Sequence, residues 1–148
     1  MSKKYDVAIV GATGAVGETL VSILDQRNFP INNLYPLASK RSAGTKVTCQ
    51  GKSWTVEDLD TFDFSKAQIG LFSAGGHISE IYAPIAAKSG CTVIDNTSHF
   101  RRDKDIPLVV PEVNAHAISD YTNRNIIANP NCSTIQMLVA LKPIYDAV

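Results

Sequence analysis

Three cysteines are the residues best suited to nucleophilic chemistry, and one of them is distinguished by its position. Cys132 lies in the run Asn-Pro-Asn-Cys-Ser-Thr at residues 129–134, between an apolar segment and a helical pattern. The positive end of a helix and its unpaired N–H groups favour the thiolate, the reactive form of a thiol. Cys49 and Cys91 lie in strand-like segments, where the usual role is that of a small buried side chain. Cys132 is therefore a candidate nucleophile, with a structural role as the alternative.

A glycine-rich segment, GATGAVG at residues 11–17, could bind phosphate groups. It follows the apolar run 7–10 and opens a helical pattern, which is the context that a dinucleotide-binding loop requires. Glycine lets the backbone turn tightly and approach a pyrophosphate, whose charge the helix start stabilises. The spacing is GxxGxxG instead of GxGxxG, and close packing could also explain such a turn. We expect this loop to hold a dinucleotide.

The segment SKRSAG at residues 39–44 predicts which dinucleotide binds. An NAD site usually presents an acidic residue here for the ribose 2′-hydroxyl, and none is present. Arg41 offers a planar fork to a 2′-phosphate and the serines add hydroxyl donors, so NADP is predicted. A solvated basic turn is the alternative. A thiol beside a nicotinamide would pass an acyl group through a thioester, which suits aldehyde oxidation or acyl-phosphate reduction.

The elements that must position these residues follow from the apolar pattern. Continuous apolar runs at 7–10, 69–72, 92–94, 108–110 and 126–128 predict strands buried on both faces, as in a parallel sheet. Helical patterns lie between them. One has the apolar residues Val16, Leu20, Ile23 and Leu24, and another has Ile78, Ile81, Tyr82 and Ile85. The pattern predicts an α/β fold with a Rossmann-like, doubly wound, mostly parallel sheet.

Three segments complicate this fold. Residues 33–38 form a weaker strand prediction, because Pro36 cannot donate a ladder hydrogen bond. Residues 46–56 predict a small hairpin appended to the sheet, with Gly51-Lys52 in a type II′ turn. A helix from about Ser133 has a broad apolar surface that needs a partner. We therefore assign residues 1–132 to an NADP-binding domain and 133–148 to the start of a helix leading into a further substrate and dimerisation domain.

Composition narrows the class of partner. The 148 residues suit one globular unit, with 45% hydrophobic and 19% charged residues. Lys plus Arg and Asp plus Glu both total 14, so we expect a small-molecule substrate and neither nucleic acid nor membrane. The three cysteines have no CxxC spacing, which argues against a zinc site or a disulfide framework. No signal peptide or membrane span is recognisable, and a cytoplasmic location is expected.

Taken together, the motifs resemble those of the aspartate-semialdehyde dehydrogenases. The blocks that carry the resemblance, in family order, are GATGAVG at 11–17, SKRSAGT at 39–45, LFSAGG at 71–76, DNTSHFR at 95–101, PEVN at 111–114 and NPNCST at 129–134. N-acetyl-γ-glutamyl-phosphate reductases share the chemistry but usually differ around the cysteine. The resemblance implies reduction of aspartyl phosphate with NADPH to aspartate semialdehyde and phosphate. This is a step toward threonine, methionine and lysine, the last by way of diaminopimelate.

The resemblance also implies a role for each matching residue. Cys132 carries the acyl group, Asn131 helps to position the substrate, and Arg101 contacts the substrate phosphate. The residues implied for NADP are Gly11, Thr13, Gly14, Ala15 and Val16 at the pyrophosphate, Ser39, Arg41 and Ser42 at the 2′-phosphate, and Ser73, Ala74 and Gly75 at the nicotinamide. No metal site is expected.

No histidine of this sequence matches the family's general base, which belongs to a second domain. His99 stands where the family commonly has a small residue. We therefore expect a cofactor-binding fragment that is inactive alone, from a parent that is a homodimer or homotetramer. The alternatives are an N-acetyl-γ-glutamyl-phosphate reductase-like enzyme and a non-catalytic dinucleotide-binding module. A short-chain reductase would normally need a YxxxK pair, which this sequence lacks.

Overall fold

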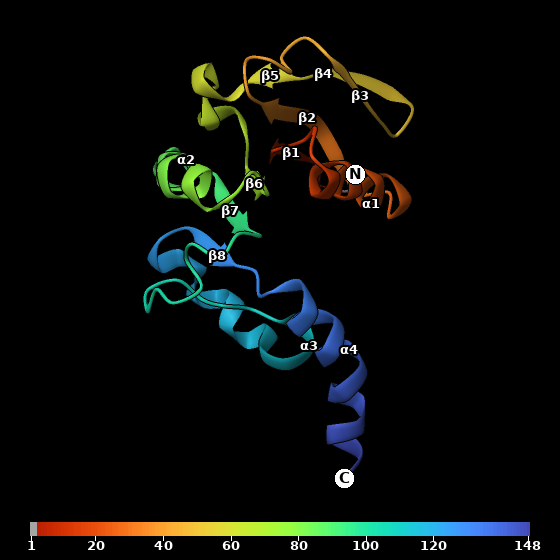
Figure 1. The fold of residues 1–148 in the computed structure, drawn as a ribbon, viewed down its shortest axis with the longest axis vertical. Coiled ribbons are helices and arrows are strands. Elements are labelled where there is room, and N and C mark those ends of the chain that lie inside the picture. The colour runs from red at the N-terminus through yellow and green to blue at the C-terminus, as the bar shows by residue number, and fades with distance from the viewer. Residues whose placement is uncertain (1–2) are drawn as a thin grey trace.

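The computed structural model describes residues 3–148, and its centre is a six-stranded sheet in the order β5-β2-β1-β6-β7-β8. Every neighbouring pair in this sheet is parallel. The strands are β1 (Tyr5–Val10), β2 (Ile31–Ala38), β5 (Glu57–Asp58), β6 (Ile69–Phe72), β7 (Thr92–Asp95) and β8 (Ile126–Ala128). Helices α1 (Ala15–Gln26) and α2 (Gly76–Lys88) form the crossovers after β1 and β6 (Figure 1). The predicted Rossmann-like fold is confirmed.

Two clusters of buried side chains form the core. One includes Val7, Ile9 and Val21, and partly buried residues of the small hairpin pack against it. The other includes Phe64 and Phe72, whose rings are stacked with centroids 6.0 Å apart. Successive residues of β1 alternate between the two clusters, as expected for a central strand buried on both faces.

Strand β2 continues through the proline that weakened its prediction. The carbonyl of Leu37 accepts hydrogen bonds from the amides of Gly11 (2.9 Å) and Ala12 (3.1 Å), so Leu37 faces β1. Because successive residues direct their backbone groups to alternate sides, the nitrogen of Pro36 faces the opposite side. There, β5 pairs only with Leu37 and Ala38. The missing N–H therefore removes no bond to β1, and the strand prediction is confirmed.

The hairpin consists of β3 (Lys46–Cys49) and β4 (Lys52–Thr55), which form a separate antiparallel sheet. Its turn residues are Gln50 and Gly51, both with positive φ (53° and 71°), which indicates a type I′ turn. The predicted type II′ turn at Gly51-Lys52 is wrong by one residue. Gln50 is held in this unusual conformation because its Nε2 donates to the carbonyl of Phe29 at 2.7 Å.

The helix faces that contact the sheet also differ from prediction. Several bulky members of the two apolar helical patterns are exposed: Val16 and Ile23 on α1, and Ile81 and Ile85 on α2. The buried residues are Gly17 and Val21 on α1, and Ser79, Ala83 and Ala86 on α2, most of which are small. Small side chains allow a helix to approach the sheet closely, so the bulky ones lie at its rim.

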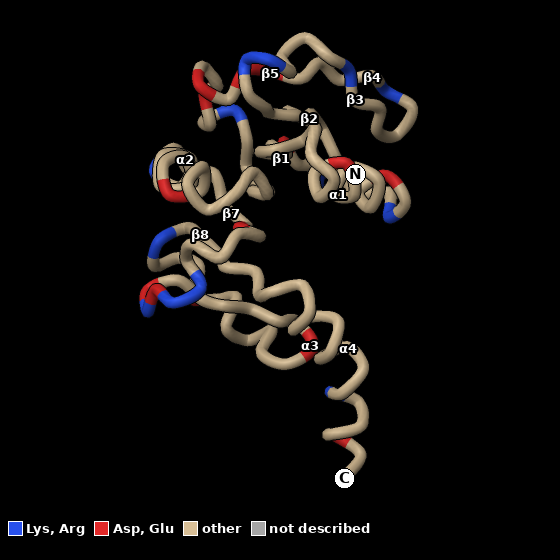
Figure 2. The backbone as a smooth tube through the Cα atoms, in the orientation of Figure 1, with Lys and Arg blue, Asp and Glu red and all other residues tan. Residues whose placement is uncertain are grey.

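The predicted strand at 108–110 is wrong: only Leu108 forms an isolated bridge, to Ala128. Short helical segments occupy the connections. They are η1 (Leu59–Thr61), η2 (Phe64–Lys66), α3 (Pro111–Asn114) and η3 (Ala115–Asn123). The last helix, α4 (Cys132–Ala147), extends away from the sheet and has only two charged residues, Lys142 and Asp146 (Figures 1 and 2).

Candidate active site

The glycine-rich loop packs so closely that two of its glycines have no room for a side chain. A Cβ on Gly17 would lie 2.1 Å from the carbonyl oxygen of Gly11. Gly11 itself has φ +90°, and a Cβ there would lie 3.0 Å from the backbone nitrogen of Ala74. The loop after β1 therefore touches the loop after β6. Glycine at these positions lets the start of α1 approach the strand, as a dinucleotide-binding loop requires.

The start of α1 is open to a ligand. Gly14 is its N-cap and lacks a side-chain cap. The exposed residues here are Thr13, Gly14, Ala15 and Val16. Unpaired N–H groups at a helix start attract an anion, and no side chain covers them. The residues expected at the pyrophosphate therefore lie together and in a suitable place.

Cavities flank this loop on both sides. One of about 260 Å³ is lined by residues of the glycine loop and by Ala38, Ser39, Asp60 and Ile78. A larger one of about 590 Å³ lies between α1 and the hairpin, and is lined by Thr13, Ser42 and Thr45 among others. The basic segment thus borders both cavities.

The basic segment is held by its backbone while its arginine is exposed. The amide of Ser42 donates to the carbonyl of Ser39 at 2.8 Å, and the Oγ1 of Thr45 donates to the carbonyl of Ser42, also at 2.8 Å. The amide of Gly44 donates to the carbonyl of Val56, which ties the segment to the end of the hairpin. Arg41 is exposed. A cation on a fixed loop beside a cavity fits a phosphate group.

The loop after β6 lies beside the glycine loop, at the same carboxyl end of the sheet. Ser73 donates from its amide (2.9 Å) and its Oγ (3.1 Å) to the carbonyl of Val10 at the end of β1. Gly75 has φ +98° and is the N-cap of α2. Ser73, Ala74 and Gly75, the residues that the resemblance implies at the nicotinamide, thus lie beside the glycine loop.

Cys132 is the first residue of α4, and its thiol is exposed, whereas the thiols of Cys49 and Cys91 are buried. Asn131 is the N-cap, and its Oδ1 accepts a hydrogen bond from the amide of Ser133 at 2.9 Å. Burial raises the pKa of the Cys91 thiol to about 12. Burial, followed by the negative charge of Asp25, also raises the pKa of the Cys49 thiol. Of the three cysteines, Cys132 is the one placed for chemistry.

Four polar residues around the end of β7 form connections that the sequence did not predict: Ser79 on α2, Asp95, Asn96 and Asn129. Asp95 is fully buried, and its carboxylate accepts from the Oγ of Ser79 at 2.8 Å. The side-chain nitrogen of Asn129 donates to the Oδ1 of Asn96 at 2.7 Å, so the loops after β7 and β8 are joined. The pair Asp95-Asn96, directly after the apolar run 92–94, could have indicated these connections, because a buried acid at the end of a strand needs hydrogen-bond partners.

The three histidines, His77, His99 and His116, are all exposed. His77 faces Glu80 at 3.7 Å with 80% of its side chain exposed, and His99 lies edge-on to the ring of Phe100. Among residues 3–148, no group of three or more His, Cys, Asp or Glu is arranged to hold a metal ion. No helix in the same range is long and apolar enough to cross a membrane.

The parallel sheet, the glycine loop and the thiol at a helix start define a nucleotide-binding α/β domain that also bears a candidate nucleophile. Residues 6–121 match the family described as semialdehyde dehydrogenase, NAD binding domain. The chain belongs to this family, and the resemblance seen in the motifs is confirmed.

Individual relatives agree with this membership. An aspartate-semialdehyde dehydrogenase of Shewanella sp. (strain DB6705) is 67% identical over 147 residues, which cover 99% of this chain and 44% of that protein. The crystal structure of aspartate semialdehyde dehydrogenase II complexed with ASA from Vibrio cholerae has a TM-score of 0.96 and 62% identity, covering 99% of this chain and 48% of that one. The structure from Candida albicans with NADP, at 24% identity and a TM-score of 0.76, covers 98% and 48% and shows the fold alone. The chain thus spans less than half the length of these relatives.

Proposed function

We propose that this chain is the NADP-binding and nucleophile-bearing part of an aspartate-semialdehyde dehydrogenase. The observation that carries the proposal is the placement of Cys132. It lies just after β8, at the carboxyl ends of the parallel strands, where the glycine loop also follows β1. In doubly wound sheets a dinucleotide binds at the carboxyl ends of the strands. The thiol and the proposed nicotinamide site therefore lie at the same end of the parallel strands.

NADP fits the residues present. The start of α1 is exposed and has no side-chain cap, which suits a pyrophosphate, and the cavity beside Ala38 and Ser39 suits the adenine half. Ser42 lines the neighbouring cavity of about 590 Å³, and it would hold the 2′-phosphate together with the exposed Arg41. Ser73, Ala74 and Gly75 would line the nicotinamide side. When bound, NADPH would supply the hydride for the reduction.

The chain's own residues would prepare the acyl group. The sulfur of Cys132 attacks the acyl carbon of aspartyl phosphate, the C–O bond to phosphate breaks, and phosphate leaves with that electron pair. The thiol proton is taken by a base. Asn131 would help to position the substrate, and Arg101 would contact its phosphate. A further part of a longer protein, in keeping with the length of the relatives, would supply the base, cover α4 and form the homodimer or homotetramer. A cytoplasmic location belongs to the same proposal.

Cofactor titration tests the first half of this proposal. NADPH should bind the chain more tightly than NADH, measured by the change in nicotinamide fluorescence. Arg41→Ala should weaken NADPH binding by about tenfold or more, because a charge-assisted hydrogen bond is lost, and leave NADH unchanged. Lys40→Ala, which removes the neighbouring exposed charge, is the matched control. Equal affinities for the two cofactors would contradict the assignment of the 2′-phosphate contact.

A further inference from the structure

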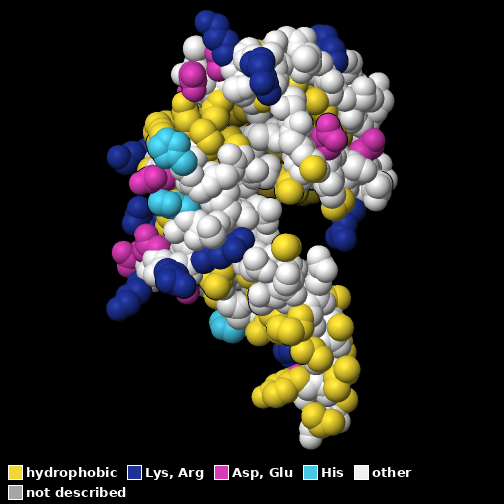
Figure 3. Space-filling view, in the orientation of Figure 1, with side chains coloured by type: hydrophobic (Ala, Val, Ile, Leu, Met, Phe, Trp, Pro, Cys, Tyr) yellow, Lys and Arg dark blue, Asp and Glu magenta, His cyan; other side chains and the backbone are white. Residues whose placement is uncertain are grey.

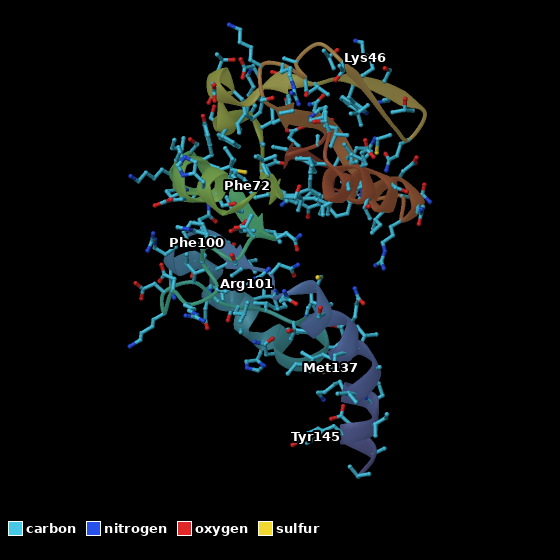
Figure 4. All side chains as sticks on the ribbon, viewed as in Figure 1. Lys46, Phe72, Phe100, Arg101, Met137 and Tyr145 are labelled. Carbon is cyan, nitrogen blue, oxygen red and sulfur yellow. The ribbon has the colours of Figure 1, made fainter. Side chains whose placement is uncertain are left out.

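Arg101 is held against the backbone that immediately precedes Cys132. Its Nε donates to the carbonyl of Asn129 at 2.8 Å. Its Nη2 donates to the carbonyls of Asn96 (3.1 Å) and Pro130 (3.3 Å). Figure 4 places Arg101 between the sheet and the helices α3 and α4. A single guanidinium thus joins the loop after β7 to the two residues that lead into the thiol-bearing helix.

This attachment is anchored in the core. The amide of Asn129 donates to the carbonyl of Asp95 at 2.8 Å, and Asp95 is fully buried. The carboxylate of Asp95 accepts from the Oγ of Ser79 on α2 and from the Oγ1 of Thr97, both at 2.8 Å. A buried network whose members are all satisfied is rigid. The loop that bears Arg101 therefore has a fixed frame against which the segment before α4 can be held.

We propose that Arg101 is a positioning residue for Cys132, in addition to any contact with the substrate. The oxygens of the Asn129 and Pro130 carbonyls are partly negative, and turning either toward the sulfur would disfavour the thiolate. Arg101 directs both oxygens toward its own positive charge, while Asn131 caps the helix start. Within residues 3–148 its Nη1 donates to no acceptor, so a phosphate could still bind there. The proposal rests on the proposed function, in which Cys132 carries the acyl group.

The guanidinium shape matters as much as its charge. Arginine presents several N–H donors in a fixed planar fork, whereas the ammonium of lysine is a compact point charge. Nε and Nη2 reach three carbonyls of two loops at once. An ammonium on a lysine side chain cannot reproduce this planar geometry. Replacement by lysine therefore separates positioning from simple attraction between a cation and a thiolate.

The test measures the alkylation rate of Cys132 in the 148-residue chain with iodoacetamide near neutral pH, followed by mass spectrometry. Arg101→Ala should lower the rate by about two- to fivefold, the range expected when a charge loses its alignment with a helix end. Arg101→Lys should stay similarly slow although it keeps the charge. Arg102→Ala, which removes the adjacent exposed cation, should react at the wild-type rate.

Two outcomes would overturn the proposal. A wild-type rate in Arg101→Lys would show that charge alone acts, and an equal loss in Arg102→Ala would show a long-range effect of charge. If the reagent labels the buried Cys49 and Cys91 in Arg101→Ala, the fold of that variant is damaged. The alkylation rate of Cys132 in Arg101→Lys then decides whether the proposal holds. NADPH titration of the wild-type chain is read separately. Failure to bind NADPH would count against the proposed function and leave the alkylation comparison intact.

Discussion

The two halves of the candidate site are built in different ways. The cofactor half is fixed by backbone packing, since the loops after β1 and β6 touch and Gly17 leaves no room for a Cβ. The thiol half has little packing: α3, η3 and α4 contain no buried residue within the described chain. Hydrophobic side chains lie exposed along α4, including the labelled Met137 and Tyr145 (Figures 3 and 4).

This difference indicates which properties the chain can supply by itself. A nucleotide site made from close backbone contacts needs no further support, because its geometry is a consequence of the fold. The direction of the thiol depends instead on the cap at Asn131, on the contacts of Arg101 and on whatever covers the apolar surface of α4. We therefore expect cofactor binding to be robust in this chain and catalysis to be weak.

The comparison is tested most strongly by turnover. With aspartate semialdehyde, phosphate and NADP, the 148-residue chain should be about 10²- to 10⁴-fold slower than the full-length Vibrio cholerae relative, because the proposed function assigns the positioned acid or base to a further part of the protein. A steady-state assay of NADPH formation measures it. Comparable rates would mean that a base lies among His77, His99 and His116, which would then be the first residues to replace.

The second test concerns the contrast among thiols. Cys132 should be alkylated far faster than the other cysteines in the folded chain. With its pKa raised to about 12, the Cys91 thiol is ionised to a fraction of only about 10⁻⁴ near pH 8. Brief iodoacetamide treatment and peptide mass spectrometry measure the order. Labelling in 6 M guanidinium chloride, where all three react, is the control, and preferential labelling of Cys49 in the native chain would refute the ranking.

The third test sharpens the view that the cofactor half depends on packing. Gly17→Ala should lower the free energy of unfolding by about 1–3 kcal/mol, because its Cβ would collide with the carbonyl of Gly11. Urea denaturation measures this change. Gly14→Ala is the matched control, since its Cβ would lie 3.5 Å from the same carbonyl, an ordinary contact. Equal losses in the two variants would show that close packing is not the cause.

The smallest effect is expected at the helix cap. Asn131→Ala should destabilise the first turn of α4 by about 1 kcal/mol, because the amide of Ser133 loses its acceptor. Amide hydrogen exchange of Ser133 and its neighbours measures the change. Asn131→Ser should behave almost as the wild type, since serine is a comparable cap. Unchanged exchange in the alanine variant would mean that α4 is held by other contacts.

The sequence predicted the parts of the fold that depend on local pattern. Continuous apolar runs identified the central strands because a parallel sheet is buried on both faces. The glycine loop and the position of Cys132 at a helix start were predicted because both depend on residues close together in the chain. The run 108–110 also matched the strand pattern but forms only one bridge, from Leu108 to Ala128 at the end of β8.

What could not be predicted depends on tertiary contacts. Val16 and Ile23 matched a buried helical face, yet the close approach of α1 placed Gly17 and Val21 against the sheet instead. The turn at Gln50 was missed by one residue because its positive φ is supported by a hydrogen bond to Phe29, distant in sequence. The carbonyl contacts of Arg101 have no sequence signal either, because their acceptors are backbone atoms.

The form of the sheet's two edges bears on how this protein behaves at high concentration. An exposed edge strand can template pairing with another molecule. At one edge, β5 is only two residues long, and both of them, Glu57 and Asp58, are acidic. At the other edge, the last residue of β8 is occupied, since Ala128 exchanges hydrogen bonds with Pro107 and Val109. Strand-by-strand aggregation of folded molecules is thereby discouraged at both edges of the sheet.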